Sequence, residues 1–375
     1  MTQTLSEAAA GKRRGNQPGA LNVRLALWVH NRAVVRPLVN LSAALVVGII
    51  VQIATDTFFV QRNLMGLFVQ MAVVATIACP MALVMVTGSI DVSVGGIVVL
   101  SGVVAGLLSH AGAPLWVAFG VATLVGVLVG YINSVLVIYL EITSMIATIG
   151  TMYVCQGAAN ILTNGLPVPG VAKNYSALGS GRLWDLIPYQ APITIGVVVL
   201  FVLIQRYTVL GRHAIATGSN LEGAFLNGVN VRRTLTLCFL LSGLVSGFGG
   251  VLYSSRIGNP MPVMDQDLLF QVIVSCVVGG IVLTGGEGTV FGAFTGAILI
   301  VVLNNALNLL GVSTFWQYVS LGLLLVIAVG LDKVRLGDHL KFKNSIFRVS
   351  AHAEDAPAAP AVPNPIEEPT EEPER

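Results

Sequence analysis

The chain has 375 residues, of which 55% are hydrophobic and only 10% are charged, and its formal net charge is +2. A soluble domain needs roughly a quarter of its residues charged to cover its surface, so this composition excludes a water-soluble globular protein. We therefore expect an all-α integral membrane protein whose surface is mostly in contact with lipid.

Residues 1–37 form a polar and basic segment without the apolar core and cleavage site of a signal peptide. Within it, residues 21–36 are apolar but carry Arg24, Arg32 and Arg36, so this part is too short and too charged to cross a bilayer. An amphipathic helix lying on the inner leaflet fits this pattern.

Ten apolar runs follow, each near the length that crosses the hydrocarbon core. Two of them are short and adjoin glycine-rich stretches, namely 95–109 and 268–283. The runs predict a bundle of about ten transmembrane helices at 38–55, 64–87, 95–109, 115–140, 143–163, 190–206, 234–253, 268–283, 290–311 and 314–331. The transmembrane domain is accordingly expected to cover residues 38–332.

Basic residues are distributed unequally between the two sides of this bundle. With ten spans, sixteen of the 20 lysines and arginines fall on the side of the N-terminus, and four fall on the other. Basic residues accumulate on the cytoplasmic side of a membrane, so both termini are predicted to be cytoplasmic. We expect a multi-pass protein of the bacterial inner membrane.

Ionisable residues are rare in the predicted spans. Asp91 and Glu141 fall at predicted turns, and Asp265, Asp267 and Glu287 fall in or beside predicted loops. A transporter coupled to protons or sodium usually has carboxylates near midplane, so we expect the driving energy to come from outside this chain. The lack of charge along the spans also favours a neutral solute.

Neither a catalytic cluster nor a metal site is predicted. The spans hold no clustered histidines, cysteines or paired carboxylates at catalytic spacing, so an enzyme is not expected. The cysteines have no metal-site or disulfide spacing, and we interpret them as small apolar residues within helices. They are Cys79, Cys155, Cys238 and Cys276.

Glycines four residues apart occur on four of the predicted spans. At this spacing they share one helix face and allow two backbones to approach closely, which predicts a tightly packed bundle. The pairs are Gly102 and Gly106, Gly126 and Gly130, Gly243 and Gly247, and Gly292 and Gly296.

The first motif, TGSIDVSVGG at 87–96, interrupts an apolar stretch with glycines and one acid. A broken helix exposes backbone groups, which are tolerated at membrane depth only next to protein or a water-filled path. Asp91 could simply cap the following helix, or Asp91 and Ser93 could lie at an inner gate or subunit contact. Gly88 and Gly95 are the other gate candidates in this motif.

The second motif lies in the largest internal loop on the predicted cytoplasmic side, 207–233. Asn220 as a cap, Glu222 in a first turn and Gly228 as a stop predict a short helix there. A membrane protein driven by an external motor needs a rigid cytoplasmic contact for that motor. Our candidates for this coupling contact are Gly211, Arg212, Gly218, Asn220, Glu222, Ala224 and Gly228.

The third motif, at 279–296, again places a glycine cluster with one acid between two apolar runs. Gly285, Gly286 and Glu287 are further candidates for the path or its gate. Similar interruptions in the two halves of the chain suggest a repeated architecture. Beyond them, residues 333–375 are predicted to be cytoplasmic, and the acidic, proline-rich part from 351 onward is predicted to be disordered.

These motifs resemble the permease subunits of carbohydrate-uptake ABC importers, the ribose-type permeases, from about Leu64 to Asp332. The chain has GSIDVSVG where the family has GGIDLSVG, and GRHAIATGSNLEGAFLNGV where the family has GRHVYAIGGNPEAARLSGI. It also has GGIVLTGGEGTVFG in place of GGTSLFGGRGTVWG. It departs at Leu221, where proline is frequent, at Phe225, where a basic residue is common, and at Glu287, where arginine is frequent.

The resemblance implies the ABC importer permease fold and import of a monosaccharide, such as a pentose or hexose, or of a related polyol, by alternating access. It implies as partners a second permease chain, an ATP-binding subunit and an extracytoplasmic sugar-binding protein, and no nucleic acid. ATP and magnesium would be bound by the partner, and the chain has no GxxxxGK[ST] phosphate loop. An ABC permease for a nucleoside or a branched-chain amino acid and a secondary transporter remain the alternatives.

Overall fold

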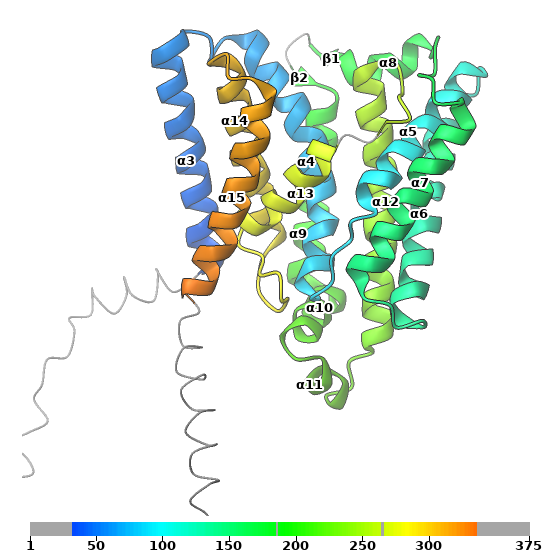
Figure 1. The fold of residues 1–375 in the computed structure, drawn as a ribbon, viewed down its shortest axis with the longest axis vertical. Helices are drawn as coiled ribbons and strands as arrows, with labels where there is room; N and C mark the ends of the chain where they lie inside the picture. Colours follow the sequence, from blue (N-terminus) through cyan, green and yellow to red (C-terminus); the bar gives the residue numbers. More distant parts are fainter. Residues whose placement is uncertain (1–31, 185–186, 264–265, 336–375) are drawn as a thin grey trace, which may run out of the picture. The chain divides into compact units, whose positions relative to one another are not determined.

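The computed structural model describes residues 32–184, 187–263 and 266–335, and these residues are almost entirely helical (Figure 1). The chain divides into a unit that ends at Ala328 and a second unit, 329–375. The predicted segment before residue 32, Asp265 and the predicted tail lie outside the described residues. The elements are α3 (Arg32–Thr55), α4 (Gln61–Val86), α5 (Val94–His110), α6 (Leu115–Ile138), α7 (Ser144–Thr163), α8 (Lys173–Ser180), β1 (Arg182–Leu183), β2 (Ile187–Pro188), α9 (Gln190–Tyr207), α10 (Val209–Ser219), α11 (Leu221–Leu226), α12 (Val231–Ile257), α13 (Gln266–Val278), α14 (Val290–Leu309) and α15 (Thr314–Arg335).

Every apolar run predicted from the sequence overlaps a helix. Seven helices are long and apolar enough to cross a membrane, namely α3, α4, α6, α7, α9, α12 and α14. Three further apolar helices, α5, α13 and α15, are shorter over the residues that the structure describes. A polytopic helical membrane protein is therefore supported, whereas the predicted count of ten spans remains a prediction.

Two helices are short because glycine-rich segments break the chain beside them. Residues 87–93 are not helical, and they connect the end of α4 to the start of α5 (Figure 1). After α13 the chain leaves the helix at Gly279, and Gly280 has a φ of +94°, which favours glycine. The predicted helix 268–283 was therefore too long at its C-terminal end.

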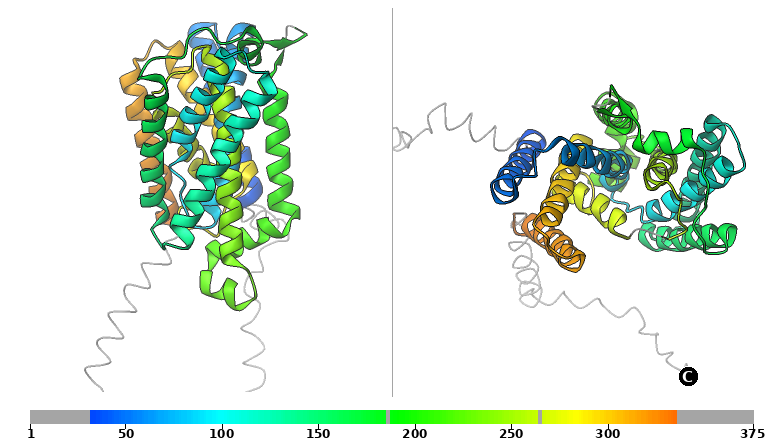
Figure 2. Two further views of the ribbon diagram at one scale, coloured as in Figure 1. Left: turned by 90° about the vertical axis from the view of Figure 1, so that its right-hand side faces the viewer. Right: turned by 90° about the horizontal axis from the view of Figure 1, so that it is seen from above.

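Helix α4 lies in the interior of the bundle. Every residue from Ala72 to Val86 is buried, and α4 contacts α9, α12, α13 and α14. The view along the bundle shows α3 and α15 at one side and α6 and α7 at the other (Figure 2). The outward faces carry large apolar side chains such as Ile53 and Ile161, each 79% exposed, as expected for helices that face lipid.

Close backbone packing joins α6 to α12, as the glycine spacing predicted. A Cβ added to Gly126 would lie 2.1 Å from the carbonyl oxygen of Gly243, and a Cβ added to Gly243 would lie 2.2 Å from that of Gly126. No side chain fits at that distance, so glycine on both helices is what allows them to approach. Gly296 of α14 packs in the same way, with an added Cβ 2.1 Å from the Ser275 carbonyl oxygen.

The two ends of the bundle are different. Helices α10 and α11 protrude at one end, and α8 with the small antiparallel hairpin of β1 and β2 covers the other (Figures 1 and 2). Tyr175 anchors α8, since its buried hydroxyl is hydrogen-bonded to Ser254 of α12. Burial raises the pKa of Tyr175 to about 12, so its hydroxyl stays protonated at any physiological pH.

Candidate functional site

Helix α11 forms the tip of the protruding end, and the sequence specifies both of its ends. The side chain of Asn220 accepts a hydrogen bond of 2.8 Å from the Gly223 amide, which caps the helix. Gly228 ends the turn with a φ of +80°. The predicted cap and stop are therefore confirmed, and Glu222 lies in the first turn as expected.

Three of the four exposed side chains of α11 are apolar, and the fourth is Glu222. Leu221, Phe225 and Leu226 are 59%, 69% and 76% exposed, whereas Ala224 is only 6% exposed. Ala224 thus faces the body of this chain, and its neighbours face outward. Adjacent exposed apolar side chains on a protruding element are typical of a protein contact surface.

Helix α10, which the sequence analysis treated as loop, connects this tip to the bundle. The hydroxyl of Thr208 accepts a hydrogen bond of 3.4 Å from the Gly211 amide and caps the helix. Gly211 packs on the backbone of α9, since an added Cβ would lie 2.1 Å from the Gln205 carbonyl oxygen. Arg212 is exposed. The segment 207–233 is therefore two consecutive helices on a rigid support.

The end of α10 meets the breaks after α4 and α13 at a single place. The Gly286 amide donates a hydrogen bond of 2.8 Å to the Val86 carbonyl oxygen. A Cβ added to Gly218 would lie 1.9 Å from that same oxygen and 2.5 Å from the Gly286 amide nitrogen. We call these three residues, with Gly88 and Gly285, the glycine junction.

Gly88 and Gly285 complete the glycine junction. They have φ values of +83° and +85°, and an added Cβ on Gly285 would lie 2.5 Å from the Gly88 amide nitrogen. The three motifs singled out in the sequence thus converge, and their glycines leave no room for side chains. The contacts between α10 and both breaks are therefore between backbones. Glu287 lies next to the junction and is exposed.

Gln205 of α9 is hydrogen-bonded to the end of the second break, the non-helical segment between α13 and α14. Its side-chain amide donates a hydrogen bond of 3.0 Å to the Gly288 carbonyl, and its side-chain oxygen accepts one of 2.7 Å from the Val290 amide, the first residue of α14. The sequence analysis missed this residue, for which the only signal was a polar residue near the end of an apolar run.

Asp91 is completely buried and lies in the first break, the non-helical segment between α4 and α5. One carboxylate oxygen accepts hydrogen bonds from the Ser93 amide and hydroxyl, and the other accepts one of 2.6 Å from the Ser242 hydroxyl of α12. As predicted, Asp91 lies in the connection between two helices, and its hydrogen bonds join this connection to the bundle interior. Its bond to the Ser93 amide lies before α5, whose N-cap is Ser93 and has no side-chain cap, so the structure does not support the capping interpretation. Gly95 is buried in the first turn of α5.

Further polar side chains extend this cluster to α6 and α7. Asn133 donates a hydrogen bond of 2.7 Å to the Ser93 hydroxyl and accepts one of 2.7 Å from Thr151. The Val92 amide donates one of 3.1 Å to Thr148. The first break is therefore fixed to α6, α7 and α12. The sequence signal for these partners was single polar residues within apolar runs, which does not indicate what they contact.

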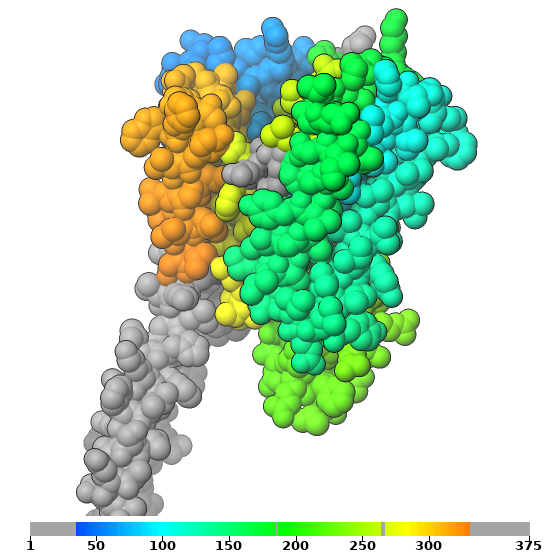
Figure 3. All heavy atoms as spheres, turned by 45° about the vertical axis from the view of Figure 1, so that its right-hand side comes forward, coloured from blue at the N-terminus to red at the C-terminus, as the bar shows by residue number. Residues whose placement is uncertain are grey.

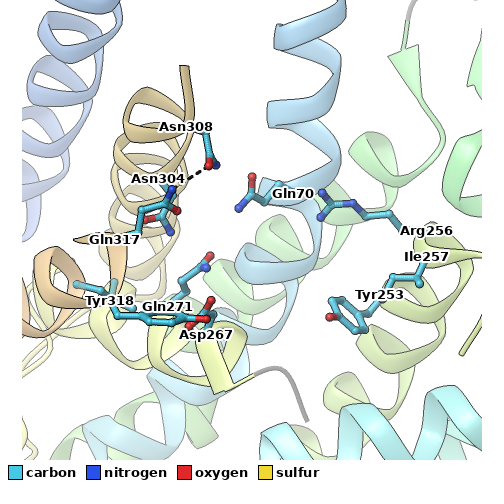
Figure 4. A pocket seen from close by; sticks show the side chains of 11 residues that line it. Gln70, Tyr253, Arg256, Ile257, Asp267, Gln271, Asn304, Asn308, Gln317 and Tyr318 are labelled. Carbon is cyan, nitrogen blue, oxygen red and sulfur yellow. Dashed lines mark hydrogen bonds between the residues drawn. The ribbon is translucent and has the colours of Figure 1, made fainter. Parts of the chain in front are cut away.

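A polar cavity of about 430 Å³ lies between α4, α12, α13, α14 and α15 (Figure 4). None of the residues predicted for a path or gate lines it. Asp267, expected in or beside a loop, is in the first turn of α13 and faces this cavity. The lining residues are Gln70, Tyr253, Arg256, Ile257, Asp267, Gln271, Asn304, Asn308, Gln317, Tyr318 and Leu321.

Apolar outer faces, a buried polar interior, broken helices and a protruding helical segment at one end together define a class of protein: a polytopic helical membrane transporter. Comparison with known proteins gives the family. Residues 63–329 match the family described as branched-chain amino acid transport system / permease component. Since that match covers most of the chain, the protein belongs to this permease family.

Named relatives agree with this assignment. The L-arabinose ABC transporter permease protein AraH of Azospirillum brasilense is 35% identical over 304 residues, 80% of this chain and 89% of that protein. The ribose import permease protein RbsC of Bacillus subtilis is 35% identical over 316 residues, 81% and 95% of the two chains. The galactose/methyl galactoside import permease protein MglC of Salmonella typhimurium is 33% identical over 301 residues, 74% and 88%. No solved structure matches the chain.

The predicted resemblance to ABC importer permeases is thus confirmed. The chain is a permease subunit, a transport component without catalytic activity of its own, and it lies in the inner membrane. Such a subunit works with an ATPase and a substrate-binding protein.

Proposed function

We propose that this chain carries a monosaccharide into the cytoplasm by alternating access, driven by a partner ATPase. Two kinds of observation support the substrate: the relatives are named for arabinose, ribose and galactose, and the described spans carry few charges. The observation that carries the mechanism is the glycine junction, where Gly218 of α10 contacts both the break after α4 and the break after α13.

In this mechanism the ATPase binds the exposed face of α11. Phe225 and Leu226 form the contact, and Ala224 packs the short helix onto its own chain instead of entering the partner. When ATP draws the motor domains together, α10 moves and its displacement reaches Val86 and Gly286 through the junction. ATP and magnesium belong to the ATPase, and this chain binds neither.

The proposal sets the orientation and the assembly. Helices α10 and α11 face the cytoplasm, both termini lie on that side, and ten helices span the membrane between residues 38 and 332. The unequal distribution of basic residues supports this orientation, as does α3, which begins at the end of the bundle where α10 lies (Figure 1). Two copies of the chain form the permease, and the loaded binding protein docks at the end covered by α8.

The test is uptake into proteoliposomes that contain the permease, its ATPase and its sugar-binding protein. D-Ribose, L-arabinose and D-galactose are each added outside the vesicles together with the binding protein. ATP is enclosed inside the vesicles, on the side that the ATPase faces. We expect at least one sugar to accumulate only when ATP and both partners are present. Saturable uptake by the permease alone would contradict an ATP-driven importer and favour a facilitator.

A branched-chain amino acid is the second candidate substrate, because the matched family is described by that transport system. L-Leucine offered in the same proteoliposomes separates the two candidates. Accumulation of leucine and not of a sugar would assign this chain to amino acid import.

A further inference from the structure

The polar cavity lies in the half of the bundle away from α11. Its residues come from the last turn of α12 at Tyr253, the last turns of α14 at Asn304 and the first turn of α15 at Tyr318. In the proposed orientation this is the outer half, which a solute released by the binding protein reaches first. Figure 3 shows the molecular face between the orange segment of α14 and α15 and the green segment of α7, with yellow residues of α13 between them.

Carboxamide groups dominate the cavity. Gln70, Gln271 and Asn304 point into it from three different helices, and none of these three side chains is hydrogen-bonded to another residue that the structure describes (Figure 4). Amides between membrane-spanning helices are costly unless water or a ligand satisfies them. Their convergence therefore indicates a solvated site for a polar molecule.

The charged residues of the cavity already have partners. Arg256 and Asp267 each take part in an interaction within the protein, so the carboxamides are the groups left for a ligand. A carboxamide both donates and accepts hydrogen bonds, which matches a hydroxyl group that does the same. Tyr253 and Tyr318 add aromatic rings to the wall. The volume of about 430 Å³ is in the range of small-molecule sites.

We propose that this cavity is a monosaccharide-binding site of the permease itself, occupied after the binding protein releases its sugar. The inference rests on the proposed function and deepens it, because it gives the membrane subunit a share in choosing the sugar. Neutral hydroxyl-rich ligands fit the cavity better than leucine, whose side chain would find only Ile257 and Leu321 as aliphatic wall residues.

The test uses the complete transporter in proteoliposomes with saturating binding protein, and compares Asn304→Leu and Gln271→Leu with Ser42→Leu. Ser42 is exposed in the middle of α3 and does not line the cavity, so it is the matched control. Each cavity variant should reduce sugar uptake roughly three- to tenfold, the effect of losing one hydrogen bond to the ligand. The relative rates for D-ribose, L-arabinose and D-galactose should also change, which a general loss of stability would not produce.

Gln271→Asn retains the amide and shortens its reach, so it should recover part of the uptake; it also serves as the test variant if the leucine forms do not assemble. If the wild type is active and the cavity variants keep the same uptake and the same sugar preference, the inference is overturned. The cavity would then hold only water. Failure of the wild type to accumulate any of the three sugars would instead overturn the proposed function, so the two failures are distinguishable.

Discussion

At the scale of single residues, Gly218 connects the protruding segment to the rest of the permease. An added Cβ would lie 1.9 Å from the Val86 carbonyl oxygen, which is backbone and has no flexible end to move aside. Any side chain at this position must therefore push α10 away from the breaks. The absence of a side chain is what allows this close contact.

Gly218→Ala is expected to uncouple ATP hydrolysis from transport and to cost about 1–3 kcal/mol of stability, as overpacking usually does. Gly196→Ala is the matched control, because a Cβ at Gly196 of α9 meets no atom within 4 Å. Thermal unfolding in detergent and the ratio of uptake to ATPase activity measure both effects. Equal behaviour of the two variants would show that the junction is not tightly packed.

Asp91 provides a second residue-scale prediction through its partner on α12. Ser242→Ala removes a hydrogen bond to a buried carboxylate and should destabilise the protein by about 1.5–3 kcal/mol. Ser246→Ala, one turn further along the same helix, is an equally buried control whose hydroxyl has no hydrogen-bond partner among the described residues. Denaturant unfolding of both variants should separate them, and a loss in Ser246→Ala as large as in Ser242→Ala would refute this account of Asp91.

At the scale of elements, the proposed mechanism makes α10 and α11 one lever. Asn220 ends α10 and caps α11, so the two helices are joined without a flexible linker. The tip carries exposed apolar side chains, and the other end of the lever rests on the glycine junction. In that mechanism, force applied to α11 would reach the breaks beside α5 and α13 through backbone contacts, without depending on any long side chain.

Leu226→Glu should therefore impair transport while the permease still inserts and folds. A charge in an apolar contact typically costs enough binding energy to reduce function by about tenfold. Leu140→Glu is the control, because Leu140 is 61% exposed in the turn between α6 and α7, outside α10 and α11. ATP-dependent uptake and co-purification of the ATPase are the measurements. Normal ATPase binding by Leu226→Glu would exclude this face of α11 as the contact.

At the scale of the whole molecule, the described residues form a bundle with a protruding end at α11 and a covered end at α8 (Figure 1). The buried break, the glycine junction and the polar cavity lie between these two ends. An importer needs this asymmetry, because the ATPase and the binding protein act on opposite sides of the membrane.

The orientation can be measured by cysteine labelling, since all four native cysteines are buried and the background is low. Leu226→Cys should react with a membrane-impermeant maleimide only in inverted vesicles. Ser180→Cys, at the exposed end of α8, should react only from the outside of intact cells. Labelling of both positions from the same side would contradict the proposed topology.

The sequence alone determined the class of protein, the places of its apolar helices and both ends of α11. These features are local: a run of about 20 apolar residues crosses a bilayer whatever surrounds it, and Asn220 and Gly228 act on groups a few residues away. Helix α10 escaped prediction because Gly211 and Gly218 lower helix propensity. Gly211 packs on the Gln205 backbone of the preceding helix, and Gly218 packs on Val86 and Gly286, which are distant in the sequence.

Only the tertiary structure decided what the motifs do together. The glycine junction consists of backbone contacts, and a glycine carries no chemistry that indicates its partner. Ser242 and Asn133 are isolated polar residues in separate apolar runs until the fold brings them to the first break. The cavity is assembled from five helices, each contributing between one and three residues. Such sites depend on helix packing across the chain, because their parts are not neighbours in the sequence.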